Sequence, residues 1–226
     1  MGLTPSERLR RKIWLVSGPF GEACQRVFTH PRLAELWPEY MITQHTIIRS
    51  TVPIMRAGRD AARARGNADP VAAGVAEYFD VHMMEETDHD EWLLEDLEVL
   101  GIPRSTALSR VPSDTVAALV GSQYYWLFHY HPVALLGYFA FMEGFPPKRE
   151  LIDDLIERTG FPDAAFRTFE LHGELDPGHQ KELDRTIDEL PLTPEQEKAL
   201  GMSALNTAVL VTRSLQEVAG ALPAGS

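Results

Sequence analysis

The chain has 226 residues, of which 44% are hydrophobic and 24% charged, a composition typical of a soluble globular protein. A formal net charge of −12 makes nucleic acid and anionic membrane surfaces unexpected partners. The single cysteine, Cys24, excludes an intramolecular disulfide and a zinc ribbon. No N-terminal apolar run is long enough for a signal sequence or a membrane span, so we expect a cytoplasmic protein.

Long segments with helical periodicity, separated by proline and glycine, predict an all-α chain. We expect seven helices, over residues 5–29, 31–65, 70–100, 113–144, 147–160, 163–189 and 194–220. Pro70 and Gly101 delimit the third helix, and Thr193 caps the last. Alternating β-branched stretches are nearly absent, which predicts a single helical domain over residues 1–226.

The third predicted helix carries titratable residues inside its apolar stripe. His82, Glu86 and His89 are spaced i, i+4 and i+7, so they share one helix face. The same face continues through apolar residues on both sides, namely Val75, Phe79, Leu93, Leu97 and Leu100. Glu85 lies at the margin of this face, so Glu86 is the better-aimed carboxylate.

The sixth predicted helix repeats the pattern with His172, Asp176 and His179. These residues are again spaced i, i+4 and i+7 within an apolar stripe. Pro177 lies between two of them and removes a helical hydrogen bond, so we expect a kink or an unwound turn there.

Ionisable side chains in a core must be paired with each other or bound to a metal. Hydrogen-bonded histidine–carboxylate pairs would explain one such triplet, whereas two matching triplets favour a shared metal site. Imidazole and carboxylate ligands suit iron, manganese or zinc. Glu143 is a third candidate contributor to this metal site. It lies at the C-terminal end of the fourth helix, where the helix dipole disfavours a negative charge, so an inward position paired with a metal suits it better than an exposed one.

Other histidines are weaker candidates. His129 and His131 precede Glu143 by 14 and 12 residues, on the order of 20 Å along one helix, so they join the site only if Pro132 folds the helix sharply. In the second helix, Gln44, His45 and Arg49 are candidate substrate contacts, and His45 is also a candidate ligand. A half-buried surface histidine and a solvated arginine are the alternatives for His45 and Arg49.

The chain resembles the heme-oxygenase-like di-iron oxidases and oxygenases, also called iron-containing redox enzymes. The run His82-x2-Glu85-Glu86-x2-His89-x2-Trp92-x3-Asp96-Leu97-x2-Leu100-Gly101 is similar to the third-helix motif of that family. Gly137-Tyr138 with Glu143-Gly144, followed by His172-x3-Asp176-x2-His179, resembles its later ligand positions. The resemblance implies a seven-helix heme-oxygenase-like bundle that binds two Fe(II) ions, or manganese, and uses O2 as cosubstrate. Known activities include oxidative decarboxylation of fatty acids, cleavage of amino-acid side chains and N-oxygenation of amines.

The leading hypothesis is therefore a di-iron enzyme acting on a small organic substrate. The expected ligands are Glu86, His89, Glu143, His172, Asp176 and His179, with His82 next. The family usually supplies a carboxylate from an earlier helix or seven residues before the equivalent of His89. Here that position is His82, and no acidic residue lies between Glu39 and Asp60, so His82 or His45 is the expected substitute.

Two alternatives remain open at this point. One is a non-catalytic helical protein whose ionisable stripes bind a structural metal or pair internally. The other is a metal-free enzyme of the same fold that works by acid–base chemistry on a heterocycle. Thiaminase-II-like enzymes share the fold and use a nucleophilic cysteine, but Cys24 does not occupy that place. A homodimer is also left open.

Overall fold

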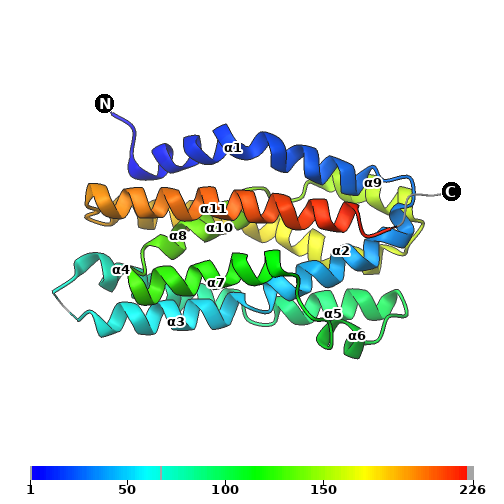
Figure 1. Cartoon of the computed structure of the whole chain (residues 1–226), viewed down its shortest axis with the longest axis horizontal. Helices are drawn as coiled ribbons and strands as arrows, with labels where there is room; N and C mark the ends of the chain where they lie inside the picture. Colours follow the sequence, from blue (N-terminus) through cyan, green and yellow to red (C-terminus); the bar gives the residue numbers. More distant parts are fainter. Residues whose placement is uncertain (1, 67, 223–226) are drawn as a thin grey trace.

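The structure is a computed structural model that describes residues 2–66 and 68–222. It is an all-helical bundle, with no strand among the described residues (Figure 1). Its helices are α1 (Pro5–Phe28), α2 (Leu33–Ile48), α3 (Thr51–Ala64), α4 (Pro70–Glu85), α5 (His89–Val99), α6 (Arg104–Leu108), α7 (Asp114–His129), α8 (Ala134–Met142), α9 (Arg149–Thr159), the 3-10 turn η1 (Asp163–Phe166), α10 (Arg167–Glu189) and α11 (Pro194–Ala219). The all-α prediction is confirmed.

The predicted helical segments are all present, but three of them are each divided in two. The segment 31–65 breaks between α2 and α3 at Arg49 and Ser50. Pro53 explains this break, because it lacks the N–H that would bond to the Arg49 carbonyl in a continuous helix. The segment 113–144 breaks between α7 and α8 around Pro132, and the short helix α6 lies in a region where no helix was predicted.

The third break lies inside the first ionisable triplet. The chain leaves α4 at Glu85 and enters α5 at His89, with Asp88 in the left-handed region at φ 70°. Aspartate is one of the few residues besides glycine that tolerates this conformation. The prediction of one continuous helix over 70–100 is therefore wrong, although His82, Glu86 and His89 are at most 7% exposed.

The last helix before α11 is more regular than the sequence suggested. α10 runs from Arg167 to Glu189 without interruption, and Pro177 lies inside it. The predicted unwinding at Pro177 is therefore wrong. One missing hydrogen bond costs less than the packing that holds this helix, since its apolar residues Leu183 and Ile187 are fully buried in the core.

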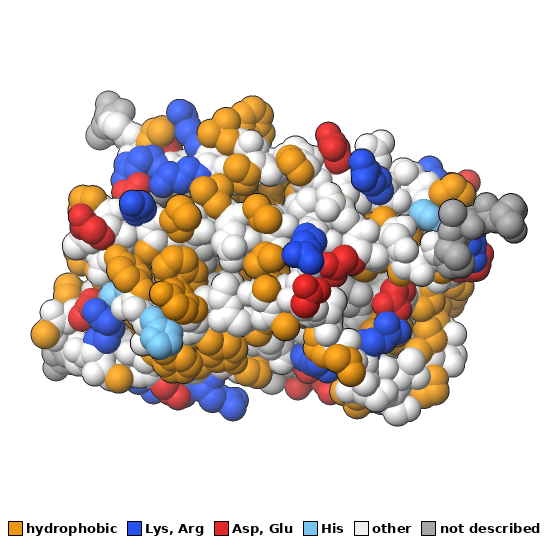
Figure 2. All heavy atoms as spheres, in the orientation of Figure 1, with side chains coloured by type: hydrophobic (Ala, Val, Ile, Leu, Met, Phe, Trp, Pro, Cys, Tyr) orange, Lys and Arg blue, Asp and Glu red, His pale blue; other side chains and the backbone are white. Residues whose placement is uncertain are grey.

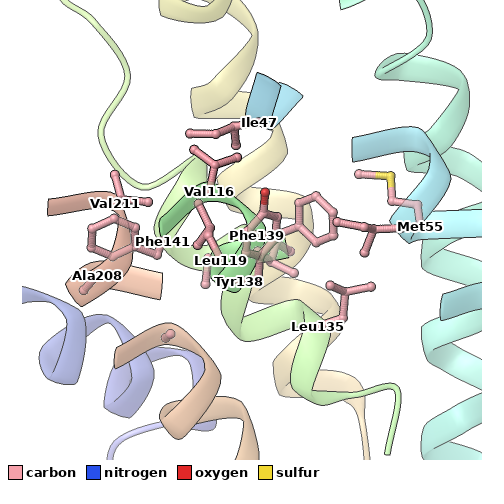
Figure 3. Packing of buried hydrophobic residues seen from close by; sticks show 14 of the residues in the cluster. Ile47, Met55, Val116, Leu119, Leu135, Tyr138, Phe139, Phe141, Ala208 and Val211 are labelled. Atoms are coloured by element: carbon pink, nitrogen blue, oxygen red, sulfur yellow. The ribbon is translucent and has the colours of Figure 1, made fainter. Parts of the chain in front are cut away.

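Helix α8 forms the centre of the core, and its residues from Ala134 to Phe141 are all buried. Figure 3 shows Leu135, Tyr138, Phe139 and Phe141 of α8 packed among side chains of the surrounding helices, including Ile47, Met55, Val116, Leu119, Ala208 and Val211. α1 and α11 lie side by side along one long edge of the bundle (Figure 1). The end of α8, where Glu143 lies, is therefore held from several sides.

The surface carries both signs of charge. Lysine and arginine side chains are interspersed with aspartate and glutamate on the face seen in Figure 2, with no continuous basic stripe there. Among the described residues, no helix combines the length and apolarity needed to cross a bilayer.

The close approach of α8 to α11 requires glycine at position 137. A Cβ added to Gly137 would lie 2.1 Å from the backbone oxygen of Leu200, so the two helices would have to separate. We expect Gly137→Ala to lower the free energy of unfolding by at least about 1–3 kcal/mol, measured by urea denaturation.

The matched control is Gly121→Ala in α7, where an added Cβ meets nothing within 4 Å. It removes backbone freedom from the unfolded chain without a clash, so it should leave stability unchanged or raise it by about 0.5–1 kcal/mol. Equal stability of the two variants would contradict the described packing of α8 on α11.

Candidate metal centre

Four side chains from separate parts of the chain meet at the centre of the bundle. His82 and Glu86 come from α4 and its end, Glu143 from the end of α8, and His179 from α10. One ligand atom of each lies within 4.8 Å of the others, and all four residues are buried. Two ligand atoms that are each about 2.1 Å from one ion are separated by up to about 4 Å, so shifts of less than about 1 Å would let all four bind the same ion.

His82 is held between two carboxylates. Its Nε2–H donates to Glu143 Oε1 at 2.8 Å and its Nδ1–H donates to Glu85 Oε2 at 3.2 Å. Burial disfavours the charged imidazole, but the hydrogen bond and charge of Glu143 outweigh it and raise the pKa of His82 to about 9. The Tyr78 ring stacks on the imidazole, with 5.0 Å between ring centroids.

Glu86 lies between this group and a second pair of histidines. Its Oε1 is 3.5 Å from His179 Nδ1, and its Oε2 is 3.2 Å from His89 Nδ1. The rings of His89 and His172 are neighbours, with centroids 5.0 Å apart. Burial opposes ionisation of Glu86, yet His89 outweighs it and lowers the pKa of the carboxyl. One carboxylate thus faces two sets of ligand atoms, as a bridging ligand would.

The orientation of His172 is fixed from the backbone. Its Nδ1–H donates to the Thr168 carbonyl at 2.8 Å, so Nε2 keeps a free lone pair. The Thr168 N–H in turn donates to the buried carboxylate of Asp96 at 2.9 Å. Burial lowers the pKa of His172, which favours the neutral, ligating form of the ring.

The buried polar atoms of the centre lack enough partners. Among the described residues, Glu143 Oε2, Asp176 Oδ1 and the Nδ1 atoms of His89 and His179 have no hydrogen bond, because the contacts of the two imidazoles with Glu86 are close but not aligned. Each unpaired buried group costs about 1–3 kcal/mol. A cation coordinated by these atoms would remove that cost, and imidazole with carboxylate is a donor set that suits iron or manganese. The residues present therefore fit a metal centre.

Asp176 is the most perturbed carboxylate of this group. Burial, followed by the negative charges of Glu143 and Glu86, raises its pKa to about 8. Of the ligands expected from the sequence, the structure groups His82, Glu86, Glu143 and His179. His89 adjoins Glu86, His172 adjoins His89, and Asp176 lines the same cavity as Glu86 and Glu143.

The remaining candidates do not belong to the ligand cluster. His45 is fully buried rather than half-buried, and neither ring nitrogen has a hydrogen-bond partner within the described parts of the chain. It does not belong to the four-residue group. The cavity next to the centre is lined by Gln44 but not by His45 or Arg49. His131 is buried against Asp69, 3.0 Å away, and His129 is exposed, so neither joins the centre.

A cavity of about 630 Å³ opens onto the centre. Its lining includes Glu86, Glu143, His172 and Asp176. Cys24 also lines it, but burial raises the pKa of the thiol to about 12, so the nucleophilic thiolate is not formed near neutral pH.

Two further residues of the centre were missed by the sequence analysis. Tyr78 lies four residues before His82, so the helical spacing could have placed it on the same face. Gln180 donates a hydrogen bond from its side chain to the backbone oxygen of Glu143, a contact that depends on how α10 packs beside α8. No local sequence pattern predicts the contact of Gln180 with Glu143.

One known protein family covers the part of the chain that holds the seven expected ligands from His82 to His179. The family described as iron-containing redox enzyme matches residues 81–211, more than half of the chain. The chain belongs to this family. The resemblance inferred from the ligand motifs is thereby confirmed. Comparison with curated proteins gives no match.

Solved structures confirm the heme-oxygenase-like fold. A domain of unknown function with that fold from Shewanella denitrificans is 20% identical, with a TM-score of 0.73 over 94% of this chain and 88% of that chain. A CADD-like protein of unknown function from Nostoc punctiforme is 16% identical, with a TM-score of 0.69 over 95% of each chain. A TenA homologue from Pseudomonas syringae is 10% identical, with a TM-score of 0.64 over 91% of each. At these identities the likeness shows the fold alone.

The raised pKa of Asp176 has a consequence for stability without metal. With a pKa of about 8 in the folded protein, against 3.8 as its ordinary value, Asp176 keeps its proton between these pH values while the unfolded chain loses it. Its contribution to stability therefore falls as pH rises through this range. We expect Asp176→Asn to be more stable than wild type in the presence of a chelator, by a margin that grows from about pH 5 to about pH 8 in urea denaturation.

Asp60→Asn is the control, because Asp60 is an exposed residue of α3. It should follow the wild-type pH dependence. A constant difference between Asp176→Asn and wild type at both pH values would contradict the perturbed ionisation of Asp176.

Proposed function

We propose that this protein is a non-heme di-iron oxidoreductase that uses O2 to oxidise a small organic substrate. The observation that carries the proposal is Glu86, whose two oxygens face separate ligand groups beside a cavity large enough for a substrate. Two iron ions held there would supply the electrons that reduce O2 next to the bound substrate.

The chain would provide two neighbouring ligand sets. His82, Glu143 and His179 form the set on one side of Glu86. His89 and His172 would form the set on the other, and Asp176, which lines the same cavity as Glu86 and Glu143, would complete either. The histidine at position 82 replaces the carboxylate that the family resemblance led us to expect.

The surrounding residues would prepare the ligands. Asp96 and Thr168 hold His172 in the tautomer whose Nε2 can bind a metal. The His82 imidazole, whose pKa of about 9 keeps it charged at neutral pH, must lose a proton before it binds a metal, and Glu85 and Glu143 are the acceptors in contact with it. The buried apolar side chains around the centre lower the local dielectric constant, which strengthens the charge interactions there.

Metal stoichiometry tests the two-group arrangement. Wild-type protein loaded with Fe(II) without oxygen should bind about two irons per chain. His89→Ala removes a ligand from one side of Glu86 only, so it should bind about one. The exposed His129→Ala is the matched control and should keep the wild-type value, measured by iron analysis after gel filtration. One iron in wild type, with no further binding at excess Fe(II), would contradict the dinuclear proposal.

Oxygen uptake tests the proposed reaction class. We expect the Fe(II)-loaded protein to consume O2 measured with an oxygen electrode, and Glu86→Ala to consume it no faster than Fe(II) in buffer. Protein treated with a chelator should be inactive. A substrate turnover that persists undiminished in chelator would instead support the metal-free acid–base alternative. A protein that neither consumes O2 nor turns over a substrate in chelator would support the non-catalytic alternative.

A further inference from the structure

Two neighbouring helices expose a face without charge. Residues 115–128 of α7 and 199–212 of α11 contain no lysine, arginine, aspartate or glutamate, in a chain of which 24% is charged. Four large side chains on this face are 49–64% exposed, namely Tyr125 and Phe128 of α7 and Met202 and Val209 of α11. Figure 2 shows apolar side chains gathered over these two helices. A single exposed apolar residue is ordinary, whereas a group of them on adjacent helices is typical of an interaction surface.

The two uncharged stretches run antiparallel and are in register. The Asn206 amide of α11 donates to Ser122 Oγ of α7 at 3.1 Å. Arg213, near the end of α11, lies 3.4 Å from Asp114 at the start of α7. Ser122 and Asn206 adjoin the midpoints of the two stretches. The contact between them therefore marks the centre of the face.

Large and small side chains lie on opposite sides of this centre. On α7, Tyr125 follows Ser122, whereas Ala118, which is also exposed, precedes it. Because the helices are antiparallel, Met202 of α11 lies in the same half of the face as Tyr125, and Val209 lies in the half that contains Ala118. One half is thus bulky and the other is comparatively flat.

Charged residues close the face at both ends. Asp114 and Arg213 lie at one end, and Lys198 precedes the uncharged stretch of α11 at the other. An apolar centre surrounded by a polar rim is the usual anatomy of a protein–protein interface.

The size of the face fits a dimer. The four large side chains expose about 400 Å² of mostly apolar surface, at the upper end for one patch of a monomer. The alanines and polar atoms between them extend the face to on the order of 700–800 Å², the area that each partner buries in a specific interface. A bilayer is a poorer occupant, because a net charge of −12 is repelled by anionic lipids.

We propose that this face is the interface of a homodimer. Its two-fold axis lies in the plane of the face, crosses both helices and passes through the contact of Ser122 with Asn206. Rotation about this axis lays α7 of one copy on α7 of the other in the opposite direction, and does the same for α11.

The rotation matches the bulky half of one copy with the flat half of the other. The Tyr125 ring of each copy lies on Ala118 of the other, and Met202 lies against Val209. Each contact occurs twice, and no charged side chain is buried at the centre. The face is therefore complementary to itself, which is the property that an interface between identical chains requires.

Molar mass in solution provides the first test, and it is independent of iron. We expect full-length wild type at about 50 µM, with or without chelator, to have twice the mass of one chain in size-exclusion chromatography with light scattering, since interfaces of this size bind in the micromolar range or more tightly. Ala118→Arg places a charge where the Tyr125 ring of the other copy lies, so it should weaken association at least about a hundredfold and give mainly monomer.

The matched control is Ala73→Arg, at an exposed alanine of α4 outside the face. It should remain a dimer. Circular dichroism spectra of both variants verify that they are helical.

The register is tested with two variants of opposite charge. Ala118→Glu and Tyr125→Lys should each weaken association at least about tenfold when measured alone. In an equal mixture, the glutamate of one variant meets the lysine of the other, while the second Tyr125–Ala118 contact stays as in wild type. The mixture should therefore form a dimer that neither variant forms alone.

Four results would overturn the proposal. A monomeric wild type at this concentration would show that another partner, or none, covers the face. An Ala118→Arg variant that remains a dimer, or a dimer lost equally in Ala73→Arg, would contradict the position of the interface. A mixture of the two charged variants that stays monomeric would contradict the pairing of Tyr125 with Ala118.

Discussion

The contact of Glu86 with the imidazoles on either side of it is the constraint that the rest of the centre depends on. One carboxylate oxygen lies 3.2 Å from His89 and the other 3.5 Å from His179, residues that are 90 positions apart in the chain. Between Glu86 and His89 the helix is interrupted: α4 ends at Glu85 and α5 begins at His89, with Asp88 in the left-handed region. An unbroken helix would have kept the three ligands on one stripe but turned Glu86 and His89 differently.

The core around α8 fixes the position of Glu143 relative to the other expected ligands. Glu143 follows a helix whose residues from Ala134 to Phe141 are all buried, and Gly137 lets that helix lie directly against α11. The cost of leaving carboxylates and imidazoles partly unpaired in such a core is borne by the burial of the aromatic residues around them. A protein with no use for a cation at this position would be more stable with apolar side chains there.

Much of this could be predicted from the sequence, for a physical reason. Helical spacing determines which residues share a face, so the two triplets and the inward Glu143 are evident in the sequence alone. Where a helix breaks depends on which backbone hydrogen bonds are lost and on what tertiary packing holds the chain in place. Pro53 is a local signal for the first break, whereas the turn at Asp88 contains neither proline nor glycine to signal it. The unwinding expected at Pro177 failed because packing outweighed one lost hydrogen bond. The full burial of His45 and the cavity itself follow from how helices pack, which no single helix face reveals.

The position of the metal itself tests the role of Glu86 most directly. Crystals of the protein loaded anaerobically with Fe(II), measured at the iron absorption edge, should show two anomalous peaks about 3.5–4 Å apart with the Glu86 carboxylate between them. One peak should lie among His82, Glu143 and His179, and the other beside His89 and His172. A single peak, or peaks that do not contact Glu86, would contradict the central role assigned to this residue.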